Sequence, residues 1–373
     1  MNKIKKITLF ITLLVSLLIN IVCIMPYAGD YIDRIKNHIS PSLYFNEETP
    51  DKEVINRVIE ASMIMDNSHF SVSQPKRGLV YDVHQFIAPT SSTDRMNNYS
   101  KSFLYAGLSE WAYNKKDTKV LEYLEREMAE FSNSGKLNYN LEEVDQVPIG
   151  VCFINLYRMT NNKDYLDCAS AIYNWLLSRR VKDTNTIYYR KDSPNQFIDA
   201  LGMYVPFLVE YSKLTGDTLA HSIAYDNMLE FYKYGVDKET GIPSHGYNLN
   251  THIKVGSSNW GRGIGWYLLA ASYLPEFIEV KIDKQLSLIS KTQFPQTSKH
   301  FDSSVALLFE IYMQSRGLHS RSIDFVKPYV LQSGFVTECS GDTYDFNNHS
   351  YIFSSAEMTN GFFLMLASQL KAQ

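Results

Sequence analysis

The chain has 373 residues, of which 45% are hydrophobic and 20% charged, and its net charge is -4. This composition is sufficient for a large hydrophobic core and excludes an intrinsically disordered chain. The small negative excess also excludes a basic nucleic-acid-binding protein, so we expect no nucleic-acid partner.

The N-terminal segment has the pattern of an export signal. Lys3, Lys5 and Lys6 precede an uncharged apolar run over 7–25. This run approaches membrane-spanning length, and no clean small-residue cleavage site follows it, which favours an uncleaved anchor over a cleaved signal. We therefore predict that residues 1–28 form a signal peptide or membrane anchor. The lysines are expected inside and the body outside, on the periplasmic side of the cell envelope.

Beyond this segment the chain repeats one pattern: the apolar end of a helix, a short polar turn, and a second amphipathic helix. The turns recur at intervals of roughly fifty residues, which is typical of stacked helical hairpins. No linker rich in Pro, Ser or Gly divides the body. We therefore predict one all-α domain over 40–373, a closed toroid of helical hairpins. The pattern occurs in Leu108 to Phe131, Leu156 to Arg179 and Leu208 to Tyr232.

A glycine-rich stretch, Asn259 to Trp266, precedes the apolar run that begins at Tyr267. Its glycines let a ligand approach the main chain. Trp260 and Trp266 offer flat apolar faces, and the guanidinium of Arg262 pairs with carboxylate or phosphate. The stretch predicts a pocket for an acidic, ring-shaped ligand. In the alternative interpretation the glycines are turn residues and the tryptophans are core anchors.

Two aspartates, Asp145 and Asp199, each stand at the start of a predicted helix. Such a position is also that of an ordinary N-cap, which satisfies free backbone amides at the positive end of the helix dipole. The presence of His245 and Arg262 later in the chain favours a shared site at one end of the toroid.

These residues together resemble a known family. Ile198-Asp199 with Met203, Gly241 to His245, and the run Trp260-Gly261-Arg262-Gly263-x-Gly265-Trp266 are similar to the unsaturated glucuronyl and rhamnogalacturonyl hydrolases of glycoside hydrolase families 88 and 105. The resemblance implies an (α/α)6 barrel. It also implies a substrate whose non-reducing end is a 4,5-unsaturated uronic acid left by a polysaccharide lyase.

The resemblance further implies a role for each site residue. Asp199 would be the general acid/base and Asp145 a second essential carboxylate. Arg262 would bind the uronate carboxylate between Trp260 and Trp266, and His245 and Met203 would line the same pocket. The partner would be an acidic oligosaccharide, and neither a metal nor an organic cofactor is required. The histidines and the four cysteines also lack the clustered spacing of a zinc site.

Three positions depart from the family pattern and leave other functions open. Ile264 replaces a usual asparagine, Asn248 an acidic residue, and Tyr188 to Arg190 a region where many members carry a histidine. One alternative is a non-catalytic or altered barrel that binds or trims acidic envelope or capsular polysaccharide. Another is classical inverting hydrolysis, with the two aspartates flanking an anomeric carbon.

Overall fold

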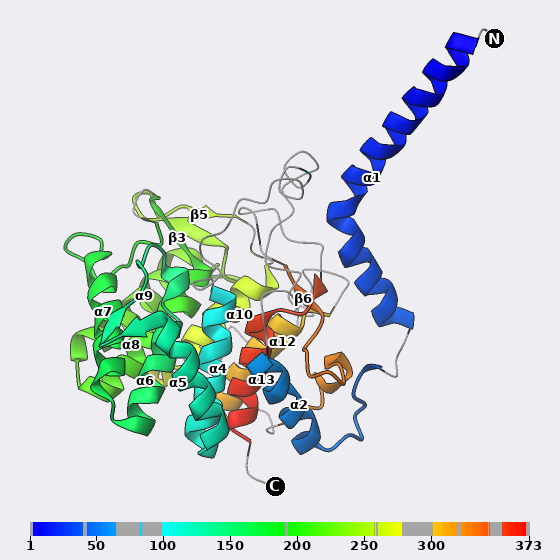
Figure 1. Ribbon diagram of the computed structural model, residues 1–373. Coiled ribbons are helices and arrows are strands. Elements are labelled where there is room, and N and C mark those ends of the chain that lie inside the picture. The colour runs from blue at the N-terminus through cyan, green and yellow to red at the C-terminus, as the bar shows by residue number, and fades with distance from the viewer. Residues whose placement is uncertain are drawn as a thin grey trace.

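The computed structural model describes residues 3–39, 43–64, 83, 99–190, 193–256, 258, 260–277, 301–318, 322–341, 343 and 353–370. Six of its helices form a closed ring, in which each helix contacts the next and the last contacts the first (Figure 1). In chain order the ring consists of α4 (Tyr99–Lys115), α6 (Ile149–Thr160), α8 (Ile198–Thr215), α10 (Gly261–Ser272), α12 (Ser303–Ser315) and α13 (Glu357–Ser368).

Further helices cover this inner ring. Three of them, α5 (Thr118–Phe131), α7 (Lys163–Ser178) and α9 (Thr218–Gly235), each contact the inner helix that immediately precedes them. Another, α2 (Asp51–Ile64), packs against α13 and α4. These contacts confirm the predicted all-helical barrel, with inner and outer helices joined as hairpins.

The hairpins turn by one repeated device. A residue in the left-handed region ends the inner helix, and the next residue caps the outer helix with its side chain. Asn161 (φ 57°) and Gly216 (φ 76°) end α6 and α8. Asn162 and Asp217 then accept hydrogen bonds from backbone N–H groups at the starts of α7 and α9. This chemistry explains why the polar turns were visible in the sequence.

The strands are short and lie between helices. In the three-stranded sheet β3 (Asn195–Phe197) pairs antiparallel with β4 (Gly246–Asn248), which pairs with β5 (Lys254–Val255). Phe197 lies opposite Gly246, so the amide of Ile198 donates to the carbonyl of His245 at 2.9 Å. This register places His245 beside the first turn of α8.

The other pairs are β1 (Ser132–Asn133) with β2 (Lys136–Leu137), and β6 (Cys339–Ser340) with β7 (Phe353–Ser354). One-turn helices η2 (Val144–Gln146) and η3 (Lys327–Tyr329) complete the described elements.

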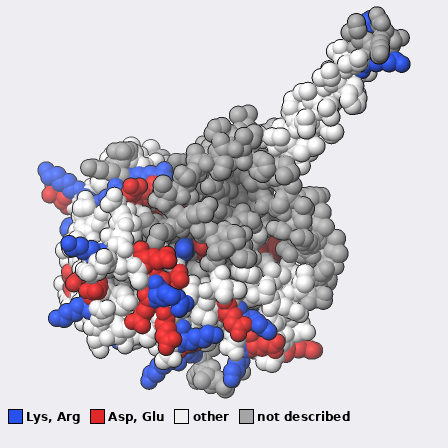
Figure 2. Space-filling model, viewed as in Figure 1, with Lys and Arg blue, Asp and Glu red and all other residues white. Residues whose placement is uncertain are grey.

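The N-terminal helix α1 (Lys3–Ile39) projects from the body (Figure 1). It continues past residue 28 without a break. Its segment Lys5–Ile24 is long and apolar enough to cross a membrane, and no part of that segment is buried in the body. Figure 2 shows basic groups at the tip of this helix and only uncharged side chains in the part drawn below them. Its contact with the body includes β7.

Candidate active site

Hydrogen bonds at one end of the barrel join the first turns of α13 and α4 and tie the start of α12 to the residue before β6. The amide of Met358 in α13 donates to the Ser100 hydroxyl in α4 at 3.1 Å. The amide of Ser303 in α12 donates to the carbonyl of Glu338, one residue before β6. The first turns of α4, α12 and α13 therefore lie close to one another or to β6 at this end.

The two predicted catalytic aspartates lie at this end, and neither is a helix cap. Asp145 is the middle residue of η2, whose cap position is occupied by Glu143. Asp199 is the second residue of α8, after Phe197 at the cap position. Its Oδ1 accepts the amide of Ala200 at 3.0 Å. Neither aspartate occupies the cap position of its helix, although Asp199 does accept a first-turn amide of α8.

The two aspartates are half-buried, and they interact electrostatically. Burial, followed by the charges of Asp199 and Glu143, raises the pKa of Asp145 to about 8. Burial also raises the pKa of Asp199, although the charge of His245, backbone N–H groups and the charge of Arg262 oppose this increase. Two partly desolvated carboxylates that repel each other cannot both ionise readily, so the pair retains a proton near neutral pH.

Tyr189 contacts this pair directly. Its hydroxyl donates to both carboxylate oxygens of Asp145, at 3.1 Å and 3.3 Å. Its ring packs against Phe197 with ring centroids 4.9 Å apart. In the sequence this tyrosine was noted only as part of a departure from the family pattern. No local signal identified it, because it lies in an irregular segment before β3.

His245 and Trp260 form one wall of the site. Their ring centroids lie 4.3 Å apart and the ring planes are inclined by 33°. The indole of Trp260 lies over the start of α10. A Cβ atom added at Gly263 would lie 2.3 Å from the Cε3 atom of this indole. This position therefore requires glycine. Trp260 is 7% exposed.

Arg262 follows in the first turn of α10, and its side chain is buried. Its Nη2 donates to the carbonyl of Gly341 at 2.6 Å, and its Nη1 donates to the carbonyl of Ser340. These bonds tie the guanidinium to β6 and fix its orientation. Its charge acts on Asp199, which places the predicted acid and the predicted carboxylate-binding residue in the same site.

Trp266 and Met203 have buried positions within the ring of helices. The indole of Trp266 stacks on Phe103 of α4 at 5.0 Å and meets Phe362 of α13 edge-on at 5.4 Å. It is 2% exposed, so its faces are occupied by neighbouring rings. Met203 is buried one turn after Asp199 in α8.

A further buried carboxyl, not predicted from the sequence, stands at the start of α13. Burial raises the pKa of Glu357 to about 7, and the charge of Lys101 in α4 opposes the shift. Its Oε1 has no hydrogen-bond partner within the described part of the chain. No group of three or more His, Cys, Asp or Glu side chains among the described residues is arranged to hold a metal ion.

The sequence of residues 80–324 matches the model of glycosyl hydrolase family 88. The chain belongs to this family. The match spans the segment that carries both aspartates, His245 and Arg262, and it confirms the resemblance inferred from the motifs. This family 88 chain is therefore a glycoside hydrolase. A search of curated proteins finds no match.

Solved structures share the fold of this family 88 protein. A possible member of family 105 from Klebsiella pneumoniae subsp. pneumoniae MGH 78578 has a TM-score of 0.66 at 13% identity, covering 86% of this chain and 93% of that chain. A family 105 glycoside hydrolase from C. acetobutylicum ATCC 824 has a TM-score of 0.60 at 18% identity, covering 76% and 96%. An unsaturated glucuronyl hydrolase specific for heparin has a TM-score of 0.57 at 13% identity, covering 84% and 94%. At these identities the likeness establishes the barrel fold.

Two other departures from the family pattern have structural roles in this family 88 protein. Asn248 donates from Nδ2 to Asn195 Oδ1 at 3.2 Å and accepts the amides of Asn250 and Thr251. It thereby joins β3 to β4 and shapes the turn that follows β4. Ile264 is buried in α10. Both residues stabilise the walls of the site through the main chain and packing.

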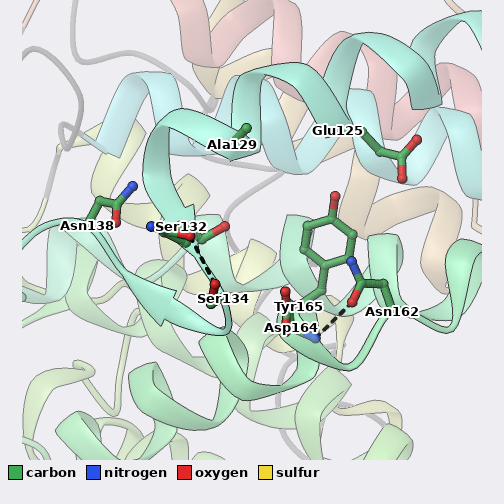
Figure 3. Close-up of a pocket in the computed structure, with 9 residues that line it drawn as sticks. Glu125, Ala129, Ser132, Ser134, Asn138, Asn162, Asp164 and Tyr165 are labelled. Carbon is green, nitrogen blue, oxygen red and sulfur yellow. Dashed lines mark hydrogen bonds between the residues drawn. The ribbon is translucent and has the colours of Figure 1, made fainter.

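A separate cavity of 320 Å³ lies between α5, the β1–β2 hairpin and the start of α7 (Figure 3). Among its described lining residues there is no basic side chain, and two carboxylates, Glu125 and Asp164, face it. Such a lining disfavours an anionic sugar. The cluster around Asp145 and Asp199 is therefore the better candidate site for a uronide. The cavity is lined by Glu125, Ala129, Ser132, Asn133, Ser134, Asn138, Asn162, Asp164 and Tyr165.

Proposed function

We propose that this family 88 protein removes a 4,5-unsaturated uronic acid, glucuronyl or galacturonyl, from the non-reducing end of oligosaccharides. The reaction would be acid-catalysed hydration of the C4=C5 enol ether. The feature that carries the proposal is the half-buried pair Asp145 and Asp199, which shares its site with His245 and Arg262 and whose pKa values are both raised by desolvation. Protonation of an enol ether requires such a carboxylic acid.

The proposed reaction balances with these groups and one water molecule. Asp199 donates its proton to C4, which leaves an oxocarbenium ion at C5. The resulting Asp199 carboxylate takes a proton from water as the water oxygen bonds to C5. The hemiketal then opens and releases the aglycone as an alcohol. Because nothing attacks the anomeric carbon, the carboxyl spacing that separates retaining from inverting glycosidases does not apply.

The remaining site residues would bind the sugar. Arg262, buried and held by two backbone carbonyls, would pair with the uronate carboxylate. Trp260 and His245 form the flat wall against which the sugar ring would lie. Met203 would line the pocket below Asp199. For Trp266 we propose an indirect part in binding, because its faces already pack against Phe103 and Phe362.

We also propose that the protein works at the cell envelope, with the segment over 7–25 as its anchor and the barrel outside. This apolar segment lies wholly outside the body, unlike the core helix of a soluble protein. The same helix contacts β7, which pairs with β6, the strand that holds Arg262. Such a connection would place the site close to the membrane, within reach of envelope polysaccharide fragments.

The test uses the full-length chain in detergent micelles. It is incubated with unsaturated disaccharides from pectin, rhamnogalacturonan, hyaluronan and heparin lyases, and the ultraviolet absorbance of the conjugated double bond is followed. Asp199→Asn is compared with Asp183→Asn, an exposed aspartate in a turn whose left-handed backbone asparagine tolerates. We expect absorbance loss with the wild type and Asp183→Asn, and none with Asp199→Asn.

Three results would contradict the proposal. Turnover retained by Asp199→Asn would remove the acid/base assignment. An unchanged double bond on every disaccharide, with binding that survives Asp199→Asn and is lost in Arg262→Ala, would favour the non-catalytic polysaccharide-binding barrel. Cleavage of saturated uronides with inversion would instead indicate classical hydrolysis by the two aspartates.

A further inference from the structure

Two contacts of its ring fix the position of the Tyr189 side chain. Its ring packs against Phe197, the residue immediately before α8, and the guanidinium of Arg190 lies 5.4 Å from the ring centroid. Arg190 is itself paired with Glu143 through Nε and Oε1 at 3.5 Å. The phenol therefore reaches Asp145 from the segment that leads into the helix of Asp199. Its hydroxyl is close to both oxygens of the Asp145 carboxylate.

In this hydrogen bond the phenol of Tyr189 is the donor and the carboxyl group of Asp145 is the acceptor. Burial and the charges of Asp145 and Asp199 raise the pKa of Tyr189 well above its ordinary value, so the phenol keeps its proton. A protonated phenol facing a carboxyl group donates, and a donated bond favours the ionised form of the acceptor. The contact thus stabilises Asp145 as an anion.

The charged groups around the pair act in opposite directions. Asp145 is faced by Asp199, Glu143 and Arg190. Asp199 is faced by His245 and Arg262, which favour its ionised form. In the free site these two positive groups favour the shared proton on Asp145, whose pKa stays raised although the bond from Tyr189 lowers it. A uronate carboxylate bound to Arg262 would offset its charge and weaken that preference.

We propose that Tyr189 is a positioning residue: its hydroxyl favours the Asp145 anion, so that once a bound uronate has offset the charge of Arg262 the shared proton resides on Asp199. This inference rests on the proposed function, in which Asp199 must protonate C4. It also gives a reason for a tyrosine in this segment of the chain. The phenol takes no part in bond making and acts only through Asp145.

The kinetic test compares Tyr189→Phe with wild type in the full-length chain. Phenylalanine keeps the ring packing on Phe197 and removes only the hydroxyl. The Asp145 anion then loses one charge-assisted hydrogen bond, and the acidic limb of the pH profile of kcat/KM should move to higher pH by about one unit. We expect kcat to fall about tenfold, because less of the pair carries its proton on Asp199, with KM changed less than about twofold.

Two companion variants sharpen this test. Tyr188→Phe removes the neighbouring hydroxyl, which makes no hydrogen bond among the described residues, and should leave both kcat and the profile unchanged. Incorporation of 3,5-difluorotyrosine at position 189 makes the phenol a stronger donor. The acidic limb should then move to lower pH, in the direction opposite to Tyr189→Phe. This second substitution keeps the proposal testable if Tyr189→Phe does not fold.

A readout without turnover separates this inference from the proposed function. The protonated-carboxyl infrared band of the full-length chain is titrated with pH, and Asp145→Asn assigns the contribution of Asp145. We expect Tyr189→Phe to move the Asp145 contribution to higher pH even if no disaccharide is a substrate. An unchanged Asp145 titration, or a lower kcat with an unmoved acidic limb, would mean that Tyr189 has only a packing role.

Discussion

Gly202 of α8 faces Trp266 of α10 so closely that a methyl group at position 202 would lie 2.7 Å from the indole Cε3. Gly202 follows Asp199 by one helical turn, and Trp266 follows Arg262 by one turn. The contact therefore sets the separation between the helix that carries the acid and the helix that carries the guanidinium. Trp266 is in turn held by the aromatic rings of α4 and α13.

Gly202→Ala should impair catalysis more than folding. The added methyl group forces α8 and α10 apart, which costs about 1–3 kcal/mol of unfolding free energy. We expect kcat/KM to fall about tenfold or more because Asp199 and Arg262 are displaced relative to each other.

Gly216→Ala, at the left-handed end of α8 with open space around it, should lose about 1 kcal/mol yet keep kcat/KM. Equal activity losses in the two variants would contradict this reasoning. Urea unfolding and steady-state kinetics measure both effects.

Asp145→Asn should stabilise the fold at the cost of activity. The folded-state pKa of Asp145, about 8, lies above its ordinary value of 3.8. The folded chain therefore binds more protons than the unfolded chain between these pH values, and stability falls as pH rises through this range. A neutral amide removes this penalty. Scanning calorimetry should show a Tm advantage for the variant that is small near about pH 4 and grows toward about pH 8.

Asp237→Asn is the control for this experiment, because the pKa of Asp237 is shifted in the direction opposite to that of Asp145. Hydrogen bonds from the backbone and side chain of Thr240 lower the pKa of Asp237 to about 2. Its contribution to stability is present above the ordinary value of 3.8 and is lost as pH falls toward 2. Asp237→Asn should accordingly lower Tm at neutral pH. A Tm advantage for Asp145→Asn that does not vary with pH would argue against a coupled aspartate pair.

Lys327→Ala should destabilise the barrel without changing the chemistry of the site. The Lys327 side chain is 4% exposed, and its ammonium pairs with Asp51 at 2.6 Å and Asp324 at 2.7 Å. It also donates to the carbonyl of Thr49 at 2.9 Å, which ties the start of α2 to η3. Removing it leaves the partly buried Asp51 carboxylate and the Thr49 carbonyl without this donor, at a cost of about 1–3 kcal/mol.

Lys254→Ala is the matched control for Lys327→Ala. Lys254 pairs with Asp237 at 3.3 Å, but both side chains are well exposed to solvent. An exposed pair contributes at most about 1 kcal/mol. Urea unfolding of the two variants should therefore give clearly different free energies, with unchanged kcat in both. Similar losses would indicate that burial does not set the strength of the Lys327 cluster.

Arg262→Lys should raise KM more than it lowers kcat. Lysine keeps the charge but loses the planar fork, so it cannot pair bidentately with a carboxylate while also donating to the carbonyls of β6. We expect KM for an unsaturated disaccharide to rise about tenfold. Arg158→Lys, at the far end of α6 where it pairs with Glu210 at 2.8 Å, should leave KM unchanged. Steady-state kinetics would decide, and an unaltered KM in Arg262→Lys would separate this residue from carboxylate binding.

The helical hairpins could be predicted because their signals are local. The left-handed residue at Asn161 or Gly216 and the capping side chain that follows it occupy adjacent positions, and the apolar periodicity extends over single helices. The contact between Tyr189 and Asp145 spans 44 positions, and the bond from Arg262 to Ser340 spans 78. Neither has a signature in spacing or composition. The glycine-rich stretch likewise presented Trp260 and Trp266 as equivalent, whereas one forms a wall with His245 and the other packs among inner-helix rings.

The sequence by itself determined the all-helical class, the apolar N-terminal segment and the family, together with the residue types that such a site requires. Periodicity, capping and motif spacing are properties of neighbouring residues, so they can be read along the chain. Only the tertiary structure decided that Asp145 and Asp199 interact in one half-buried site, that Tyr189 donates to Asp145, and that β6 holds Arg262. Burial, charge coupling and hydrogen-bond direction depend on distances through space, which arise only when the six inner helices close into a ring.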